Sequence, residues 1–303
     1  MRAAAASAPP AEKRGSSPLG RALPVAFVLG GAVSVQLGAG IADRLFTQLP
    51  PAALTTLRLW AAALILTAVA GRGAARAVSQ LVRHRDWGTA RSTIAFGIGL
   101  AAMNFAIYQA FDRIPLGIAV TIEFLGPLAV AVAGVRRLIS VLWVVLAVSG
   151  VLLLARGSGG HLNIAGVAWA LVSAAGWSAY ILLSKATGQR MTGASGLAVA
   201  MVVAAALVTG PGLVAGGRTM FRPGLLAAGA AIGLLSSVIP YWLDLEALRR
   251  VPARVFGVWQ SLQPAVAALI GLVLLGQRLS VAEWAGICCV VAASAGAARG
   301  GQS

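Results

Sequence analysis

Long apolar stretches separated by short polar segments run through almost the whole sequence. None shows the two-residue alternation of a half-buried β-strand. Most are close to the ~20 residues that an α-helix needs to cross the hydrocarbon core of a bilayer. Because that core admits only helices or closed barrels, the pattern predicts an all-α polytopic membrane protein with ten transmembrane helices. The predicted spans are 22–43, 52–71, 88–111, 115–135, 138–155, 163–184, 194–215, 224–247, 252–275 and 281–298.

The composition supports a membrane protein and excludes a nucleic-acid partner. Hydrophobic residues make up 59% of the 303 residues, charged residues 11%, and the mean hydropathy is +0.87, outside the range of soluble domains. The net charge is +16, but the basic residues form short clusters between spans without interleaved aromatic residues. The adjacent Cys288 and Cys289 lie in an apolar stretch and are expected to be small core residues rather than a disulfide.

The distribution of Lys and Arg predicts the orientation in the membrane. If the N-terminus is cytoplasmic, the inside segments hold 17 of the 24 basic residues, the outside segments hold 6, and Arg58 lies within a span. This bias follows the positive-inside rule, so both termini are expected in the cytoplasm. Residues 1–21, rich in Ala, Pro and Ser, are expected to form a disordered cytoplasmic tail.

A spacing of prolines suggests that the chain is duplicated. The Arg-x-Pro at 113–115 and Pro127 recur at 250–252 and Pro264, with an offset of 137 residues at each position. Five spans in each half is an odd number, so the halves would enter the membrane from opposite sides, as in many secondary transporters. The alternative is a coincidence in a bundle that tolerates proline. The two predicted five-helix inverted repeats are 22–155 and 163–298.

Glu123 and Arg58 are the candidate functional residues with charge inside spans. A charge at the centre of a membrane helix costs roughly 2.5–3.5 kcal/mol on insertion scales, and the chain has only eight acidic residues. One interpretation is a structural Arg58–Glu123 ion pair. The other is a site where both meet the ammonium and carboxylate of a zwitterion. Desolvation favours a neutral carboxyl group, so Glu123 is also a candidate proton carrier. Polar residues predicted at the same depth are Asn104, Tyr108 and Gln36.

The second half offers fewer charged candidates. Gln260 stands at the position that matches Glu123 and is counted among the candidate substrate-binding residues. Tyr241 and Asp244 are candidates for a cytoplasmic gate, although ion pairs with nearby arginines are the alternative for Asp244. The aromatic residues Trp177 and Tyr180 are candidates to line a cavity, with simple packing as the alternative.

Enzymatic chemistry finds little support in the sequence. The two histidines, His84 and His161, fall in predicted loops far apart in sequence. No metal-ligand spacing and no nucleotide-binding loop that ends in Gly-Lys-Ser/Thr occurs. We therefore expect neither an enzyme nor a bound cofactor or metal.

Two long motifs carry a resemblance to a known family. NFAIYQAFDRIPLGIAVTIEFLGPLAVAV at 104–132 and IPYWLDLEALRRVPARVFGVWQSLQPAVAALIGLVLLGQRLS at 239–280 resemble the threonine/homoserine exporter branch of the drug/metabolite transporter superfamily, with two EamA domains. The resemblance implies ten helices, a central cavity between the halves and export of small neutral amino acids. The chain has Gln263 and Gln277 where the family often has Glu, which leaves Glu123 as the best candidate for proton coupling.

The sequence thus predicts a secondary transporter of a bacterial-type inner membrane. It would export small neutral amino acids such as threonine or homoserine by alternating access, coupled to protons, with the lipid bilayer as its other partner. Two alternatives remain at this point. One is an exporter of another metabolite or a drug on the same fold, and the other is a membrane scaffold or sensor that transports nothing.

Overall fold

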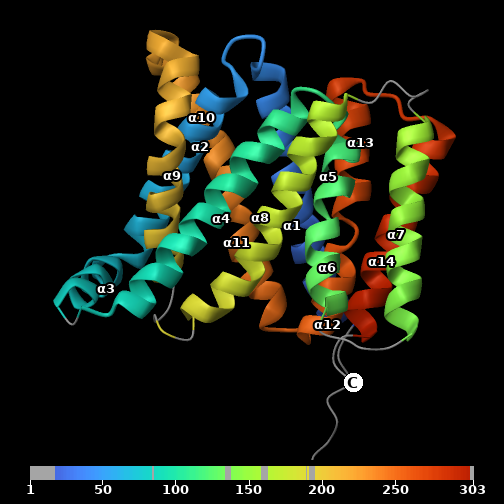
Figure 1. Ribbon diagram of the computed structural model, residues 1–303, viewed down its shortest axis with the longest axis horizontal. Coiled ribbons are helices and arrows are strands. Elements are labelled where there is room, and N and C mark those ends of the chain that lie inside the picture. The colour runs from blue at the N-terminus through green and yellow to red at the C-terminus, as the bar shows by residue number, and fades with distance from the viewer. Residues whose placement is uncertain are drawn as a thin grey trace, which may run out of the picture.

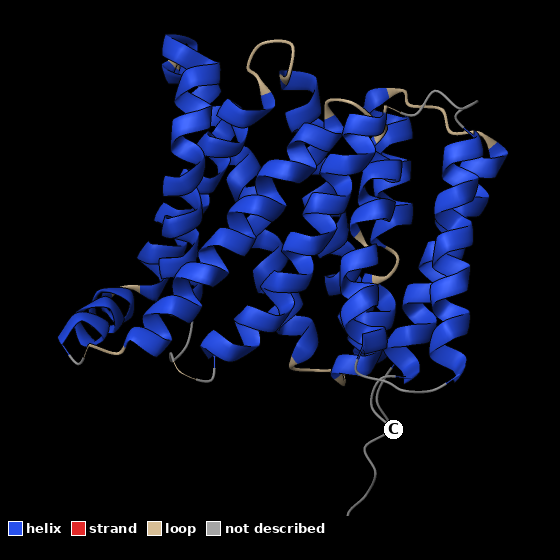
Figure 2. Ribbon diagram, in the orientation of Figure 1, coloured by secondary structure: helices blue, strands red, loops and turns tan. Residues whose placement is uncertain are grey.

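The computed structural model describes residues 18–83, 85–133, 138–157, 163–188, 190 and 195–300. All regular structure in these residues is helical, which confirms the all-α class (Figure 2). The helices, in chain order, are α1 (Pro18–Leu45), α2 (Pro51–Ala70), α3 (Arg72–Arg83), α4 (Trp87–Phe111), α5 (Leu116–Glu123), α6 (Leu125–Ala133), α7 (Leu138–Gly157), α8 (Ile164–Gly188), α9 (Ser195–Gly216), η1 (Gly217–Phe221), α10 (Pro223–Gly233), the π-turn η2 (Leu234–Val238), α11 (Ile239–Leu248), α12 (Ala253–Gln260), α13 (Gln263–Leu275) and α14 (Val281–Gly300).

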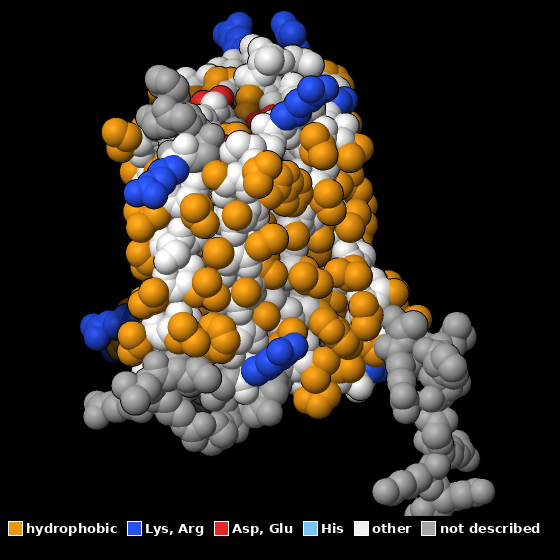
Figure 3. All heavy atoms as spheres, turned by 90° about the vertical axis from the view of Figure 1, so that its right-hand side faces the viewer, with side chains coloured by type: hydrophobic (Ala, Val, Ile, Leu, Met, Phe, Trp, Pro, Cys, Tyr) orange, Lys and Arg blue, Asp and Glu red, His pale blue; other side chains and the backbone are white. Residues whose placement is uncertain are grey.

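Ten apolar segments of the described chain match the ten predicted spans. Nine are long and apolar enough to cross a bilayer, and α7 contributes a shorter apolar stretch, Val141–Leu154. In the face shown in Figure 3, hydrophobic side chains cover the middle of the molecule, and Lys and Arg side chains gather towards its two ends. A belt of this kind suits acyl chains, with charges at headgroup level. The chain is therefore a multi-pass membrane protein.

The structure departs from expectation in two polar segments, one before the first span and one between the second and third spans. α1 begins at Pro18, inside the predicted tail, and residues 1–17 lie outside the described residues. The connection between α2 and α4, expected to be a loop, contains the twelve-residue helix α3. His84 and His161 also lie outside the described residues.

Two predicted spans are each broken into two helices. The fourth divides at Phe124 into α5 and α6, and the ninth divides at Ser261 and Leu262 into α12 and α13. A proline has no N–H to donate to the carbonyl four residues earlier. Pro127 therefore leaves the carbonyl of Glu123 without its helical donor, and Pro264 does the same at Gln260. Each span is therefore interrupted one turn before its proline.

The two breaks have the same local geometry. α5 and α12 have bounds that differ by 137 residues at each end. Both begin after a proline, with φ −53° and ψ 141° at Pro115 and φ −58° and ψ 144° at Pro252. Both end at a residue with φ −64°, and ψ is −13° at Phe124 and −10° at Ser261. The repeated prolines therefore produce a repeated backbone.

The broken segments run in opposite directions and pack on each other. In Figure 1, α5 lies above α6, whereas α12 lies below α13. α5 contacts α13 at Gly117, where a Cβ atom would come 2.7 Å from the Cα of Ala268. Glycine is required here because any side chain would push the two backbones apart.

α8 is held between α4 and α6 by close contacts at two further glycines. A Cβ on Gly176 would lie 2.7 Å from the backbone nitrogen of Met103 in α4. A Cβ on Gly126 of α6 would overlap the carbonyl of Ala174. These close approaches fix the stretch of α8 from 173 to 176 against two helices of the first half.

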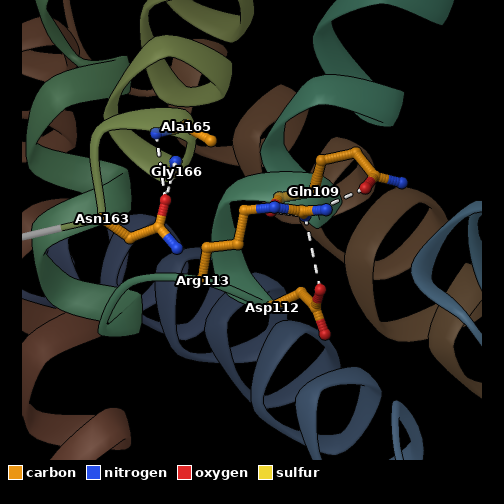
Figure 4. Close-up of polar contacts among 6 residues, drawn as sticks. All are labelled: Gln109, Asp112, Arg113, Asn163, Ala165 and Gly166. Atoms are coloured by element: carbon orange, nitrogen blue, oxygen red, sulfur yellow. Dashed lines mark hydrogen bonds and ion pairs between the residues drawn. The ribbon is translucent and has the colours of Figure 1, made fainter.

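The upper end of the bundle is closed by local polar contacts (Figure 4). Asn163 caps α8, since its Oδ1 accepts hydrogen bonds from the backbone N–H groups of Ala165 at 3.0 Å and Gly166 at 3.2 Å. Arg113, in the turn between α4 and α5, donates to Gln109 Oε1 at 3.0 Å and pairs with Asp112 at 3.3 Å. These groups are at least partly exposed, so they shape the turn and contribute little to stability.

We expect Gly117→Ala to destabilise the protein. The added methyl group meets the backbone of α13 and cannot be relieved by rotating a side chain, so the cost should be on the order of 1–3 kcal/mol. The melting temperature of the purified protein in detergent measures it. The matched control is Gly210→Ala, since nothing lies within 4 Å of that Cβ position. Equal melting temperatures for the two variants would contradict the tight α5–α13 contact.

Candidate functional site

Arg58 lies near the middle of the bundle with neutral hydrogen-bond partners. It is only 6% exposed. Its Nη1 donates to Ser236 Oγ at 2.9 Å, and its Nη2 donates to Asn104 Oδ1. The guanidinium also lies over the ring of Tyr108, 4.7 Å from the ring centroid, in a cation–π contact. Side chains from α4 and η2 therefore hold the buried positive charge of Arg58, which lies on α2, without neutralising it.

Arg58 and Asn104 meet because they lie at matching depth. Each is seven residues from the upper end of its helix, 51 to 58 in α2 and 104 to 111 in α4. The Asn104 amide is itself fixed, since its Nδ2 donates to the carbonyl of Leu100 at 2.7 Å. The structure thus brings together Arg58, Asn104 and Tyr108, while their role in binding a substrate stays a prediction.

Ser236 was not predicted, and it comes from an irregular turn. It lies in the π-turn Leu234–Val238, between α10 and α11. π-Turns widen a helix by one residue and occur often at functional sites. The widened turn also exposes the carbonyl of Leu235, which accepts a hydrogen bond from Ser34 of α1 at 2.7 Å. An apolar segment with a Ser-Ser pair gives no clear sequence signal for this shape.

Three polar atoms in or near this cluster have no hydrogen-bond partner among the described residues. They are Arg58 Nε, Tyr108 Oη and Gln36 Oε1, and all three are buried. Gln36 lies on α1, which packs against the π-turn through Gly38 and Ser236. Buried polar atoms normally find a partner, so a polar ligand or water would be accommodated here.

Glu123 has a separate set of hydrogen-bond and packing partners. It is 8% exposed and lies at the end of α5, beside the break. Ser173 Oγ lies 2.5 Å from Glu123 Oε1 and 2.9 Å from the carbonyl oxygen of Met103. Trp177, one turn further along α8, packs edge-on against Phe124 with ring centroids 4.9 Å apart. Ser173, which the sequence analysis missed, therefore links α5 to α4 through α8.

The interpretation of a structural ion pair between Arg58 and Glu123 was wrong. Neither residue forms a salt bridge with any described residue. Each is held by neutral groups instead, so no described side chain pairs with either charge.

The second-half candidates form a different cluster, in the lower half of the bundle. Gln260 Nε2 donates to Asp244 Oδ2 at 3.1 Å, and Gln263 Nε2 donates to Gln260 Oε1 at 2.9 Å. All three side chains are half-buried. Gln260 is thus brought to Asp244 and not to Glu123. The side chain of Tyr241 lies outside the described residues.

The ion pairs considered for Asp244 are made by Glu246 instead. Glu246 pairs with Arg249 at 2.6 Å and with Arg250. The hydrogen bond from the Arg250 side chain lowers the pKa of Glu246. Asp244 remains an acid without a salt bridge among the described residues, which keeps it a candidate gate residue.

Tyr180 does not join the Arg58 or Glu123 cluster. Its ring packs at a tilt against Phe96 of α4, with centroids 5.5 Å apart, within the core formed with α9. This contact is the packing considered for Tyr180, and its role in lining a cavity stays a prediction. Within the described parts of the chain, no group of three or more His, Cys, Asp or Glu residues could hold a metal ion.

The fold and the buried charges define a polytopic helical membrane protein with polar groups enclosed among its helices. The model of the EamA-like transporter family matches residues 164–298. Together with the relatives described next, this match shows that the chain belongs to the EamA-like transporter family, in the threonine/homoserine exporter branch of the drug/metabolite transporter superfamily.

Two curated relatives align over nearly their whole length. The threonine/homoserine exporter RhtA of Salmonella typhimurium is 36% identical over 279 residues, and that of Escherichia coli K12 is 34% identical over 276 residues, with 90% of each chain covered. The uncharacterized transporter YwfM of Bacillus subtilis is 31% identical over 144 residues, 47% of this chain and 49% of that protein. These relatives are named as exporters or transporters, in keeping with the expectation that this chain is not an enzyme.

A solved structure shares the fold. One crystal structure superposes with a TM-score of 0.57 at 19% identity, over 93% of this chain and 98% of the other. At this identity the likeness concerns the fold alone.

We expect Asn104→Leu to destabilise the protein and a second substitution to restore much of the loss. The single variant removes the acceptor of a buried guanidinium, at a cost of roughly 1–3 kcal/mol. In Arg58→Met/Asn104→Leu both partners are apolar, and Ser236 keeps its hydrogen bond to the carbonyl of Ile232. Melting temperatures of wild type, both single variants and the double variant form a double-mutant cycle. Additive losses would contradict a direct Arg58–Asn104 interaction.

Proposed function

We propose that this protein exports small neutral amino acids of the threonine and homoserine type, with protons moving in the opposite direction. The observation that carries the proposal is the separate placement of Arg58 and Glu123, two opposite charges each held by neutral partners. The names of the relatives that align over 90% of the chain support the same cargo.

A zwitterion suits this arrangement. Its carboxylate would be bound by Arg58, whose planar guanidinium offers several donors and keeps Nε unpartnered among the described residues. Its ammonium group would be bound by Glu123. Because both ends are then neutralised locally, the cost of taking the charges out of water is reduced. Asn104, Tyr108 and Gln36 would complete the polar wall, and Trp177 would contribute an apolar face. A hydroxyl on the substrate could donate to Gln36 Oε1.

The single hydroxyl hydrogen of Ser173 suggests how protonation of Glu123 could change the contacts between helices. A serine hydroxyl has one hydrogen to donate, but Ser173 Oγ lies within hydrogen-bond distance of two oxygens, Glu123 Oε1 and the Met103 carbonyl. When Glu123 is ionised, Ser173 must donate to the carboxylate. When Glu123 is protonated, it can donate to Ser173, which then donates to Met103. Protonation would thus join α5, α8 and α4 in one chain of hydrogen bonds.

This chain would couple the proton to the substrate site. Met103 precedes Asn104, the residue that holds Arg58, so a change at Met103 reaches the carboxylate site through one peptide unit. α8 is fixed here by the close contacts of Gly126 and Gly176, which places the hydroxyl between its two acceptors. The ammonium group of the amino acid and the proton would then compete for Glu123, so release of the amino acid would allow uptake of the proton.

Alternating access would follow from two inverted five-helix repeats, 22–155 and 163–298. With an offset of 137 residues, α1 corresponds to α8, α4 to α10–α11, and α5–α6 to α12–α13. The observed contacts respect this correspondence: α4 packs on α8 as α11 packs on α1, and α2 pairs with α9 and α7 with α14. We propose that the halves rock about the Arg58 and Glu123 clusters, with Asp244, Gln260 and Tyr241 on the path from the cytoplasm.

The proposed location is a bacterial inner membrane with both termini in the cytoplasm. The lower end of Figure 1, which carries α3 and the C-terminus, would face the cytoplasm. The excess of Lys and Arg in the connections at this end supports that orientation.

Efflux from reconstituted vesicles tests the function. Vesicles that contain purified protein are loaded with labelled threonine or homoserine, and release is followed with and without an opposing pH gradient. We expect release faster than from protein-free vesicles, and faster still with the gradient. Transport of dyes or biocides in place of amino acids would identify a drug exporter. Transport of neither would overturn the proposal.

We expect Glu123→Gln to lose gradient-driven efflux while the protein remains inserted and folded. The amide keeps the shape but can neither carry a proton nor neutralise an ammonium group. Gradient-independent exchange of internal for external amino acid separates these roles, because it needs the ammonium site but no net proton movement. Glu246→Gln is the matched control, since Glu246 forms a surface ion pair. Wild-type efflux in Glu123→Gln would remove Glu123 from both roles.

We expect Ser173→Ala to keep amino-acid exchange and to lose most of the acceleration by a pH gradient. Without the hydroxyl, protonated Glu123 has no link to the Met103 carbonyl. Ser178→Ala serves as control, because Ser178 lies on the same helix and donates to the carbonyls of Gly126 and Ala174. An unchanged response to the gradient in Ser173→Ala would show that the proton acts by another route.

A further inference from the structure

The short helix α3 is the one helix outside the apolar spans that carries a concentration of arginines. It covers Arg72–Arg83 and joins α2 to α4 with only Gly71 before it. Residues 71–91 contain five arginines and one aspartate. In Figure 1, α3 projects to the left across the direction of the spans, at the level of the lower end of α4. None of the residues of the proposed transport site lies on this helix.

The arginines of α3 share one face. At about 100° per residue, Arg72, Arg76 and Arg83 fall within about 40° of one another. The side chains of all three are exposed. On the other side, Ala74 is buried against α9, and a Cβ on Gly73 would lie 3.0 Å from Ser195 Oγ. α3 is therefore amphipathic, with one side packed on the bundle and a basic side that faces away from it.

Nearby charges and apolar groups fit a membrane surface. The side chains of Val69, Val78 and Trp87 are 70%, 43% and 66% exposed. Asp86, the acidic residue of this segment, caps α4 by accepting hydrogen bonds from the Thr89 backbone at 3.0 Å and its hydroxyl at 2.7 Å. The backbone hydrogen bond from Thr89 lowers the pKa of Asp86, but its charge does not pair with an arginine of α3. The basic face thus keeps its positive charge.

The two flanking spans fix the depth of α3. Because α2 ends at Ala70 and α4 begins at Trp87, the helix between them must lie at the boundary of hydrocarbon and water. Anionic lipid phosphates occupy this level, and Lys or Arg clusters directly beside a span are attracted to them by about 1 kcal/mol per residue. Amphipathic helices with a basic polar face lie in this plane. An exposed Trp at its edge is typical of the interface.

We propose that α3 is a docking surface for the headgroups of anionic phospholipids in the bilayer that the protein spans. Arg72, Arg76 and Arg83 bind the phosphates, and Val78 and Trp87 lie against the upper acyl chains. The helix thereby anchors the lower ends of α2 and α4, the helices that carry Arg58 and Asn104. The inference does not depend on the transported substrate.

Lipid enrichment tests the proposal directly. The full-length protein is reconstituted in vesicles of phosphatidylethanolamine and phosphatidylglycerol at 3:1, extracted in mild detergent, and the co-purified lipids are counted by mass spectrometry. We expect phosphatidylglycerol to be enriched over its bulk share. In Arg72→Gln/Arg76→Gln, the share of phosphatidylglycerol should fall towards the bulk value, because each arginine removed weakens the binding constant for an anionic headgroup by about fivefold.

The chain offers a matched control at its opposite end. Arg218 and Arg222 are also exposed and also four residues apart, but Arg218 lies within η1 and Arg222 directly follows it. Arg218→Gln/Arg222→Gln should keep the enrichment of wild type, and Arg72→Lys/Arg76→Lys should keep it too, since the attraction is to charge. Size-exclusion chromatography verifies that each variant is folded.

Four outcomes would overturn the proposal. One is equal loss in the two glutamine pairs, which would indicate an effect of net charge alone. Another is loss in the lysine pair. The third is displacement of the lipid by inorganic phosphate but not by chloride of equal ionic strength, which would indicate a site for soluble phosphate. The fourth is phosphatidylglycerol at only its bulk share among the lipids bound to wild type, with a protein bound to α3 instead. This result would equally reject lipid as the partner.

Discussion

The absence of water from the bilayer core constrains every polar group in this protein. A buried charge in hydrocarbon must be neutralised, hydrogen-bonded or exposed to a cavity. Arg58 and Glu123 are hydrogen-bonded by neutral groups and are not paired with each other. A direct ion pair would have satisfied both residues and left little for a ligand to gain. The neutral partners hold both side chains in place without pairing them, which is the basis for the proposal that a zwitterion binds between them.

The prolines make this arrangement possible. Pro127 and Pro264 interrupt their helices at the carbonyls of Glu123 and Gln260, so each half has an irregular turn at mid-membrane. Broken helices at this depth are tolerated where protein or a watery cavity covers them, and transporters use such breaks to form their binding sites. The first break carries an acid beside Ser173, and the second carries an amide bonded to Asp244. Repeated backbone with different side chains gives the two halves different chemistry.

Glycine determines how closely the helices approach. Lipid chains are as apolar as Leu or Val side chains, so helices in a membrane associate through close packing rather than hydrophobic burial. Gly117, Gly126 and Gly176 each allow a backbone contact that a methyl group would prevent. The last two hold the segment of α8 that carries Ser173. The precision of the proposed proton contact thus depends on small residues that bear no chemistry themselves.

The sequence by itself determined the class of fold, the number of spans and the depth of the charged residues. These follow from local properties: the length of an apolar stretch, the position of a proline, and the distance of Arg58 or Asn104 from a helix end. The repeated offset of 137 residues also identified the two prolines that interrupt their spans. The sequence indicated the family as well, through motifs at 104–132 and 239–280.

Only the tertiary structure decided which side chains meet. Depth along a helix says nothing about its rotation, so the sequence left open whether Arg58 faces Glu123 or Asn104. It could not indicate Ser236 or Ser173, because serine is common in membrane helices and its partners lie 178 and 50 residues away. It placed Gln260 and Tyr180 in the site, whereas helix rotation directs them to Asp244 and Phe96. Rotation and contact are set by the packing of all helices together, which no single segment encodes.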